Sequence, residues 1–170
     1  MLKAFSVNIL GLSQKAHHFD YQFGDEFFTH YGADLISGGY FAAEVTLDKH
    51  ETFIEASFKI KGQARLICDR SLDPFESRIA IDKRIVFKYG EEEAELSDEI
   101  IIISPERAVL DIGQYIYEFI ALSIPIKKLH PRYANEAEED GDGKLIYSSP
   151  VDNEEDEEID PRWEKLKKLK

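Results

Sequence analysis

The histidines and the single cysteine are the first residues to consider for chemistry. His17 and His18 are adjacent, so their side chains would diverge on either a strand or a helix. Because no further His or Cys stands at ligand spacing, we expect ordinary surface or boundary residues rather than a metal site. Gly38 and Gly39 have the composition of a phosphate-binding loop. They lack the strand-to-helix context and the following lysine that such a loop needs, so a turn is the better interpretation.

Cys68 is the only cysteine, which excludes an internal disulfide and a cysteine-rich zinc site. It alternates with Ala64 and Leu66, so we expect a small, buried residue rather than a nucleophile. No nucleophile, base and orienting group stand together elsewhere, and the abundant acidic residues cluster where they cannot hold catalytic geometry. The sequence therefore predicts no catalytic residue, no metal site and no cofactor, and the protein is not expected to be an enzyme.

One group of charged residues does indicate binding. Between residues 59 and 88, eight basic residues outnumber four acidic ones, in a chain with a net charge of −13 and a pI of about 4.8. A basic sheet face is suited to contact RNA phosphates. The alternative is a solvated face with cross-strand ion pairs, for example Arg78 or Arg84 with Asp82. The candidate RNA-binding or partner-binding residues in this zone are Lys59, Lys61, Arg65, Arg70, Arg78, Arg84 and Lys88.

The elements that must position these residues are mostly strands. Alternating apolar and polar side chains predict strands in residues 4–10, 41–47, 52–61, 64–68, 79–89 and 95–104. Short turns between strands with one polar face indicate an antiparallel sheet, and strands of this number and length suit a curled, barrel-like sheet. Gly62 is expected to mark a bulge or bend. Residues 17–31 have a mixed pattern, with a short helix around residues 25–31.

One helix is clearly indicated over residues 112–123. Asp111 can cap it, Gln114 stands three residues further on as in a capping box, and Pro125 ends it. Its apolar stripe predicts a helix that covers the sheet, with its aromatic residues in the core rather than in a ligand wall. We therefore predict an α+β fold, in which a curled antiparallel, barrel-like sheet is covered by one helix. Its central cluster should contain Ile54, Phe58, Leu66, Ile79, Ile81, Phe87, Ile116 and Phe119.

The last quarter of the chain differs in composition. Residues 136–160 hold twelve acidic residues and one lysine, with few large apolar residues, which is typical of a disordered linker. Asp160 and Pro161 then form a helix start, followed by an apolar stripe among lysines. We predict a folded domain over 1–134, an acidic disordered linker over 135–159 and a short basic helix over 160–170. Arg162, Trp163 and Lys167 are candidate partner-binding residues in this helix, and its docking on the folded domain is the alternative.

No apolar stretch is long enough to span a bilayer. Asn8 interrupts the apolar residues near the N-terminus, and no small-residue cleavage site follows, so a signal peptide is not indicated. These features predict a cytoplasmic protein without a membrane partner.

The segment GQARLICDRSLDPF, residues 62–75, resembles the signature of the bacterial large ribosomal RNA subunit accumulation protein family, also called YceD. That signature is a glycine, an alternating strand and then Cys-x-Arg-Cys-Leu. It is matched here by Gly62, Cys68, Arg70 and Leu72. Residues 111–131 resemble the family's Asp-led helix and its proline turn, and residues 157–170 resemble its terminal element, with matches at Pro125, Asp160, Pro161, Arg162, Leu166 and Leu169.

Two departures limit what the resemblance implies. Ser71 stands where the signature has its second cysteine, and the acidic segment replaces the cysteine-rich, zinc-finger-like segment of many members. The resemblance therefore implies no zinc or paired-thiol function. The matching residues expected to have a structural function are Gly62, Cys68, Leu72, Pro125, Asp160 and Pro161.

The function that the resemblance implies is that of a noncatalytic ribosome biogenesis factor, needed for accumulation of large-subunit rRNA. Its partner would be large-subunit rRNA, a pre-ribosomal particle or a ribosomal protein. Two alternatives stay open. One is an acidic adaptor or chaperone that binds a basic ribosomal protein through the linker without RNA contact. The other is a small β-barrel enzyme or ligand binder, which would need a deep pocket with convergent polar groups.

Overall fold

The computed structural model describes residues 2–32 and 36–133, which lie in one compact unit, Met1–Ala134. The predicted linker over 135–159 and the predicted helix over 160–170 lie outside the described residues. The same is true of the candidate residues Asp160, Pro161, Arg162, Trp163 and Lys167. This division of the chain therefore stays a prediction.

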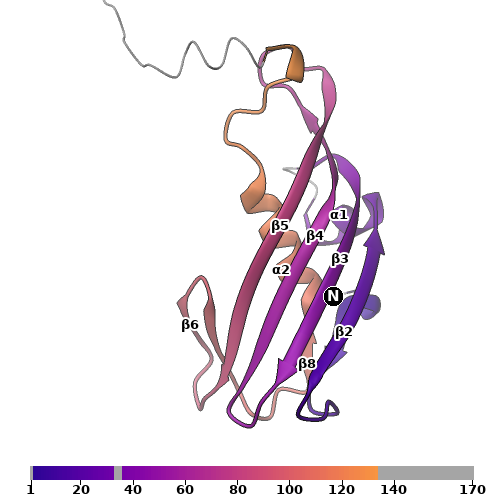
Figure 1. Cartoon of the computed structure of the whole chain (residues 1–170). Helices are drawn as coiled ribbons and strands as arrows, with labels where there is room; N and C mark the ends of the chain where they lie inside the picture. The colour runs from indigo at the N-terminus through magenta and orange to yellow at the C-terminus, as the bar shows by residue number, and fades with distance from the viewer. Residues whose placement is uncertain (1, 33–35, 134–170) are drawn as a thin grey trace, which may run out of the picture. The chain divides into compact units, whose positions relative to one another are not determined.

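A six-stranded sheet forms the body of the unit, with the strand order β2-β3-β4-β5-β7-β6 (Figure 1). Every neighbouring pair is antiparallel except β5 and β7, which are parallel. A separate two-stranded ladder pairs β1 with β8. The strands are β1 (Ser6–Asn8), β2 (Ala16–Phe23), β3 (Gly38–Lys49), β4 (Phe53–Ile67), β5 (Pro74–Tyr89), β6 (Ala94–Ser97), β7 (Ile100–Ile103) and β8 (Val109–Asp111).

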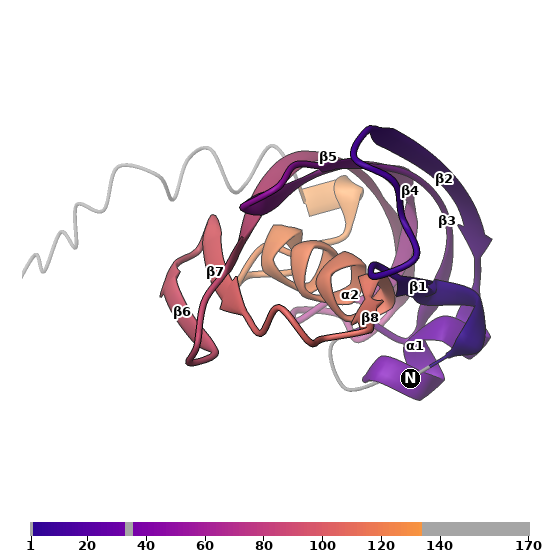
Figure 2. The same ribbon diagram turned by 90° about the horizontal axis from the view of Figure 1, so that it is seen from below.

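Two α-helices, α1 (Asp25–Tyr31) and α2 (Ile112–Ser123), accompany the sheet, and Lys3–Phe5 and Pro131–Tyr133 form short 3-10 turns. The sheet curves around α2, as the view along its strands shows (Figure 2). Asp111 caps α2, because its Oδ1 accepts hydrogen bonds from Gly113 N (3.1 Å) and from the Tyr31 hydroxyl (2.8 Å). Gln114 donates to Glu118 at 2.7 Å instead of returning to the cap, so the capping box is only half formed. None of the described helices is long and apolar enough to cross a membrane.

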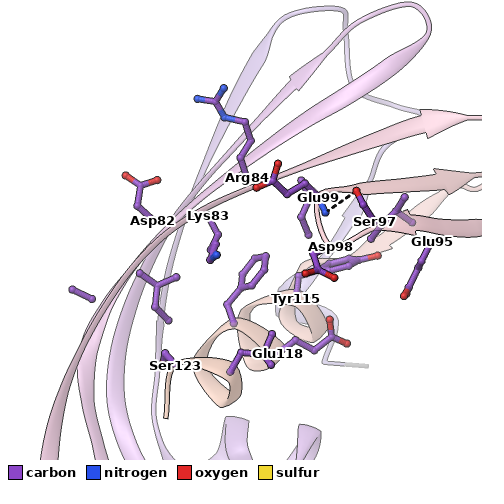
Figure 3. Close-up of a pocket in the computed structure, with 16 residues that line it drawn as sticks. Asp82, Lys83, Arg84, Glu95, Ser97, Asp98, Glu99, Tyr115, Glu118 and Ser123 are labelled. Carbon is purple, nitrogen blue, oxygen red and sulfur yellow. Dashed lines mark hydrogen bonds between the residues drawn. The ribbon is translucent and has the colours of Figure 1, made fainter. Parts of the chain in front are cut away.

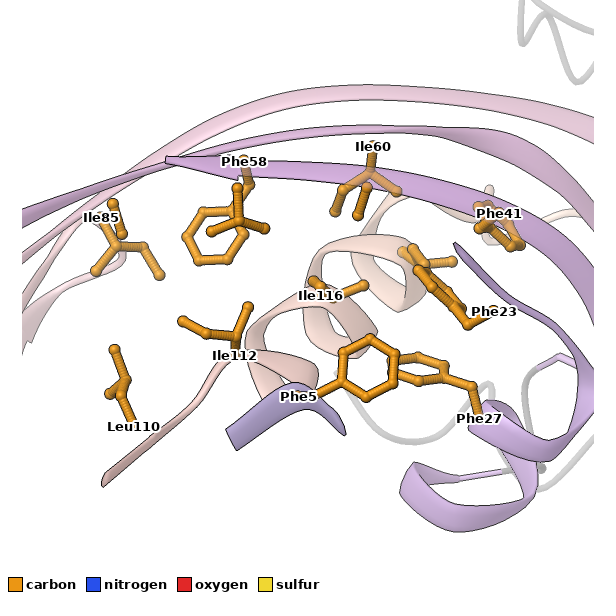
Figure 4. Packing of buried hydrophobic residues seen from close by; sticks show 14 of the residues in the cluster. Phe5, Phe23, Phe27, Phe41, Phe58, Ile60, Ile85, Leu110, Ile112 and Ile116 are labelled. Carbon is orange, nitrogen blue, oxygen red and sulfur yellow. The ribbon is translucent and has the colours of Figure 1, made fainter. Parts of the chain in front are cut away.

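The core lies between the concave side of the sheet and α2 (Figure 4). Six of the eight predicted core residues are buried, and Ile81 and Phe119 are half-buried against the same cluster. The helix stripe is confirmed too, because Ile112, Ile116 and Ile120 are fully buried. The aromatic end of the core was not predicted from the sequence. There, Phe23 and Phe27 have ring centroids 4.2 Å apart.

Several expectations need correction. The sheet is curled, but it does not close into a barrel, because β2 and β6 are separate edges and α2 fills the concave side. It is not covered by one helix alone, since α1 packs beside β3. The predicted strand over 95–104 is two strands, because the chain turns between Ser97 and Ile100. Residues 16–23, given only a mixed pattern, form a regular strand, and residues 4–10 hold only the short β1 after a 3-10 turn.

Candidate nucleic-acid interface

The six strand residues predicted to bind RNA all lie on the outer face of the sheet, away from α2. Successive residues of a strand point to opposite faces. Ile60 in β4 and Ile85 in β5 point into the core, so their immediate neighbours along each strand point outward. The six exposed basic residues on this face are Lys59, Lys61, Arg65, Arg78, Arg84 and Lys88.

Carboxylates compensate part of this face. Arg84 Nε lies 3.2 Å from Glu55 Oε1, and Arg65 Nη1 lies 3.7 Å from Asp25 Oδ2. Lys59 stands in register between Glu44 of β3 and Asp82 of β5. The ion-pair interpretation therefore describes Arg65 and Arg84, although Arg84 pairs with Glu55 rather than with Asp82.

The centre of the face is different. We call Tyr40, Lys61, Gln63 and Arg78 the Tyr40 patch. Tyr40, Gln63 and Arg78 form one row across β3, β4 and β5, and in the next row Lys61 lies between two alanines. Within the described ranges, no carboxylate lies at ion-pair distance from Lys61 or Arg78. The patch thus combines an exposed aromatic ring with two cations that form no ion pair with a described carboxylate.

Tyr40 was not among the predicted site residues. Its side chain is 62% exposed, and its hydroxyl donates to Gln22 Oε1 at 3.0 Å, which holds the ring over the sheet. An exposed ring beside cations is the arrangement on which a nucleic-acid base stacks while its phosphates meet lysine or arginine. The outward position of Tyr40 in the alternating segment Gly38–Lys49 was the sequence pattern that could have identified it.

Residues 68–73 of the signature segment form the loop between β4 and β5. Cys68 N donates to Asp73 O and Leu72 N donates to Cys68 O, both at 2.9 Å. Leu72 has a φ of 61°, in the left-handed region, and its side chain is 75% exposed. Leu72 therefore contributes to the loop through its backbone and lies outside the core.

Residues 128–133 hold this loop in place, a contact that the sequence analysis missed. Asp69 N donates to Lys128 O at 2.8 Å, and Lys128 N donates back to Asp69 Oδ2 at 2.7 Å. Arg132 forms an ion pair with Asp73. The Arg70 guanidinium lies 4.6 Å from the Tyr133 ring centroid, so this candidate residue is stacked within the loop contact.

Cys68 is fully buried, but it is not in an apolar site. Its Sγ accepts a hydrogen bond from His130 N at 3.3 Å. Burial raises the pKa of the thiol, but hydrogen bonds from Ser71, His130 and Arg70 outweigh this effect and lower the pKa to about 7.

The backbone around Gly62 and Pro125, two more residues that match the family, shows why these residue types stand there. Gly62 pairs in regular register with Phe41 and Ile79, so the expected bulge is absent from β4. A Cβ at position 62 would collide with the Tyr40 carbonyl oxygen and the Phe41 ring. Pro125 follows the end of α2, and Ile124 before it has the extended conformation that a following proline favours.

No group of three His, Cys, Asp or Glu side chains in residues 2–32 and 36–133 could hold a metal ion.

The described unit is an α+β protein with a charged sheet face. The chain belongs to the YceD family, since the family model described as large ribosomal RNA subunit accumulation protein YceD matches residues 56–170. The resemblance recognised in the sequence is confirmed. The family is named for accumulation of rRNA rather than for a catalysed reaction. No curated protein and no solved structure matches the chain.

Proposed function

We propose that this protein is a noncatalytic ribosome biogenesis factor that binds large-subunit rRNA, alone or in a pre-ribosomal particle, through the Tyr40 patch. Family membership supports the link to large-subunit rRNA. The observation that carries the proposal is an exposed ring beside two cations that form no ion pair with the described carboxylates. As part of the same proposal the protein acts in the cytoplasm, where large subunits are assembled.

The location of the patch matters because the molecule is strongly acidic. A net negative protein repels RNA at long range, so binding requires a local surface where positive charge is not cancelled. Arg65 and Arg84 each pair with a carboxylate, and they contribute less to the local potential than Lys61 and Arg78. We therefore expect contact to centre on the patch rather than on the whole face.

The test compares two double variants with the same loss of charge. Lys61→Ala/Arg78→Ala should weaken binding of the full chain to a large-subunit rRNA fragment, and should reduce the slope of log K against log salt by about 1.4 for single-stranded RNA. Arg65→Ala/Arg84→Ala should change the slope much less, because both of its cations already form ion pairs, with Asp25 and Glu55. Equal effects of the two double variants would contradict the assignment of the patch.

A stacking variant separates base contact from charge. Tyr40→Ala should weaken binding by about 1–3 kcal/mol without changing the salt slope, because stacking releases no counterions. Tyr40→Phe retains the ring and serves as the control. If Tyr40→Ala binds as tightly as the wild type, the ring is not a stacking platform.

The adaptor alternative is tested by affinity capture from a lysate with and without RNase. If rRNA binds directly, RNase treatment should release the pre-ribosomal particles. Retention of a basic ribosomal protein after RNase, together with unchanged capture by Lys61→Ala/Arg78→Ala, would favour the adaptor instead.

A further inference from the structure

β5 has a long free edge. The strand runs over sixteen residues, but β7 pairs only with its last four, from Val86 to Tyr89. On that side, residues 74–85 have no strand partner among the described residues. An edge strand presents unpaired N–H and C=O groups, which an extended segment of another chain can use for strand addition.

A groove runs along this edge, between β5, the β6–β7 hairpin and α2 (Figure 3). Its volume is about 590 Å³, and residues 80–85 of β5 line one wall. The opposite wall offers apolar contacts from Phe119, which is half-buried, and Leu122, which is 82% exposed. The groove thus places free backbone groups beside an apolar surface, as a site for an extended peptide requires.

The charge of the groove favours a basic occupant. Glu95, Asp98 and Glu99 line it from the hairpin, and Glu118 lines it from α2. Lys83 is the lining cation that strand alternation places on this inner side, whereas Arg84 lies on the outer face and pairs with Glu55. Four carboxylates against one ammonium group repel RNA phosphates, so the occupant is expected to be a protein segment rather than RNA.

We propose that this groove binds an extended lysine- and arginine-rich segment of a partner protein, which adds as a strand along residues 80–85 of β5. Its apolar side chains contact Phe119 and Leu122, and its basic side chains meet the carboxylates of the hairpin and α2. The inference does not rest on the proposed RNA function, because it uses a different face of the sheet and different residues.

The first experiment measures fluorescence anisotropy of the full chain with a labelled peptide of alternating lysine and valine. We expect it to bind at least about tenfold more tightly than a peptide of alternating glutamate and valine. Glu95→Gln/Glu99→Gln/Glu118→Gln should weaken binding by about tenfold or more, and salt should weaken wild-type binding. The matched control, Glu26→Gln/Glu51→Gln/Glu106→Gln, changes net charge equally at exposed positions outside the groove. Equal weakening by both triple variants would overturn the site.

Hydrogen exchange tests the binding mode. Peptide should slow exchange of backbone amides within residues 80–85, and not in β2, which is the sheet's other long edge strand. A peptide with alternate N-methylated amides cannot complete a strand ladder, so it should bind at least about tenfold more weakly. Unchanged exchange, or unchanged affinity of the methylated peptide, would overturn strand addition.

The basic residues 161–170 of the chain itself are the competing occupant. If a variant without residues 161–170 binds the peptide about tenfold or more tightly than the full chain, the groove serves the chain's own segment and the proposal fails. Similar affinities support a partner segment. Failure of this proposal can be distinguished from failure of the RNA proposal. The groove variants retain the Tyr40 patch, so the salt dependence of their rRNA binding should equal that of the wild type, whether or not they bind the peptide.

Discussion

At the scale of single residues, Cys68 predicts how the stability of the folded state depends on pH. Its folded pKa, about 7, is lower than the usual 9.0, so the folded state favours the thiolate. This contribution to stability is present above pH 9 and is lost as pH falls through 7. The difference in Tm between the wild type and Cys68→Ser should therefore increase from pH 6 to pH 9. A thiolate absorbance titration with a midpoint at or above the usual value would contradict this prediction.

Substitution of Cys68 also tests its surroundings. Cys68→Ser retains an acceptor for His130 N–H, whereas Cys68→Val removes it and leaves a partly buried donor unpaired, at a cost of about 1 kcal/mol. We expect the valine variant to be the less stable in urea denaturation, and the serine variant to retain rRNA binding. A serine variant that is stable but loses rRNA binding would show that the thiol itself is required.

Leu72 carries backbone strain that glycine would relieve. A left-handed conformation costs a residue with a Cβ about 1–2 kcal/mol. Glycine avoids this cost, but its larger conformational entropy in the unfolded state cancels part of the gain in stability. Leu72→Gly should therefore raise the free energy of unfolding by up to about 1 kcal/mol, while β-branched Leu72→Val should lower it. If Leu72→Gly is destabilising in urea denaturation, the exposed side chain makes a contact that the backbone argument omits.

Residue-level prediction from the sequence succeeded where it needed only alternation. Period-two spacing was enough to place Lys59 and Lys61 on one face with Arg78 and Arg84. It could not show that Glu55 pairs with Arg84 while none of the described carboxylates pairs with Arg78, because ion pairing depends on the register between strands. Alternation also places Tyr40 outward, but its row with Gln63 and Arg78 exists only in the assembled sheet.

At the scale of elements, the signature loop depends on its contact with residues 128–133. The Ser71 hydroxyl and Arg132 lower the pKa of Asp73. The contribution of this carboxylate to the stability of the fold is therefore present above its usual pKa, and it is lost as pH falls through the lowered pKa. Asp73→Asn and Arg132→Gln should be non-additive in a double-mutant cycle of Tm at low salt, with weaker coupling at high salt. Additive effects at low salt would show that the ion pair does not stabilise the loop.

The elements that local patterns misjudged share a physical cause. In β2, Phe19, Tyr21 and Phe23 alternate with Asp20 and Gln22, but the two histidines before them obscure the period. The parallel pairing of β7 with β5 has no local signature at all, because alternation identifies a strand and not its neighbour. The free edge of β5 follows from that pairing, so the groove was beyond prediction from the sequence.

At the scale of the whole described unit, two binding functions are assigned to opposite sides of one sheet. The Tyr40 patch faces outward from β3, β4 and β5, and the groove lies on the inner side, along the free edge of β5. The unpaired cations of the patch would direct RNA to one side, and the carboxylates of the groove would direct a basic protein segment to the other. A protein of this design could hold a basic ribosomal protein segment close to rRNA while keeping the two apart.

This arrangement predicts that rRNA and the lysine-valine peptide bind together. Salt screens exposed charges beyond about 10 Å at 0.1 M, so occupancy of one side should change affinity at the other by no more than about twofold. Labelled peptide titrated into the protein with and without saturating rRNA fragment measures this coupling, and a peptide–RNA titration without protein corrects for their direct association. Saturating rRNA that displaces the peptide would show that both ligands use one surface, and it would refute the assignment of two sides.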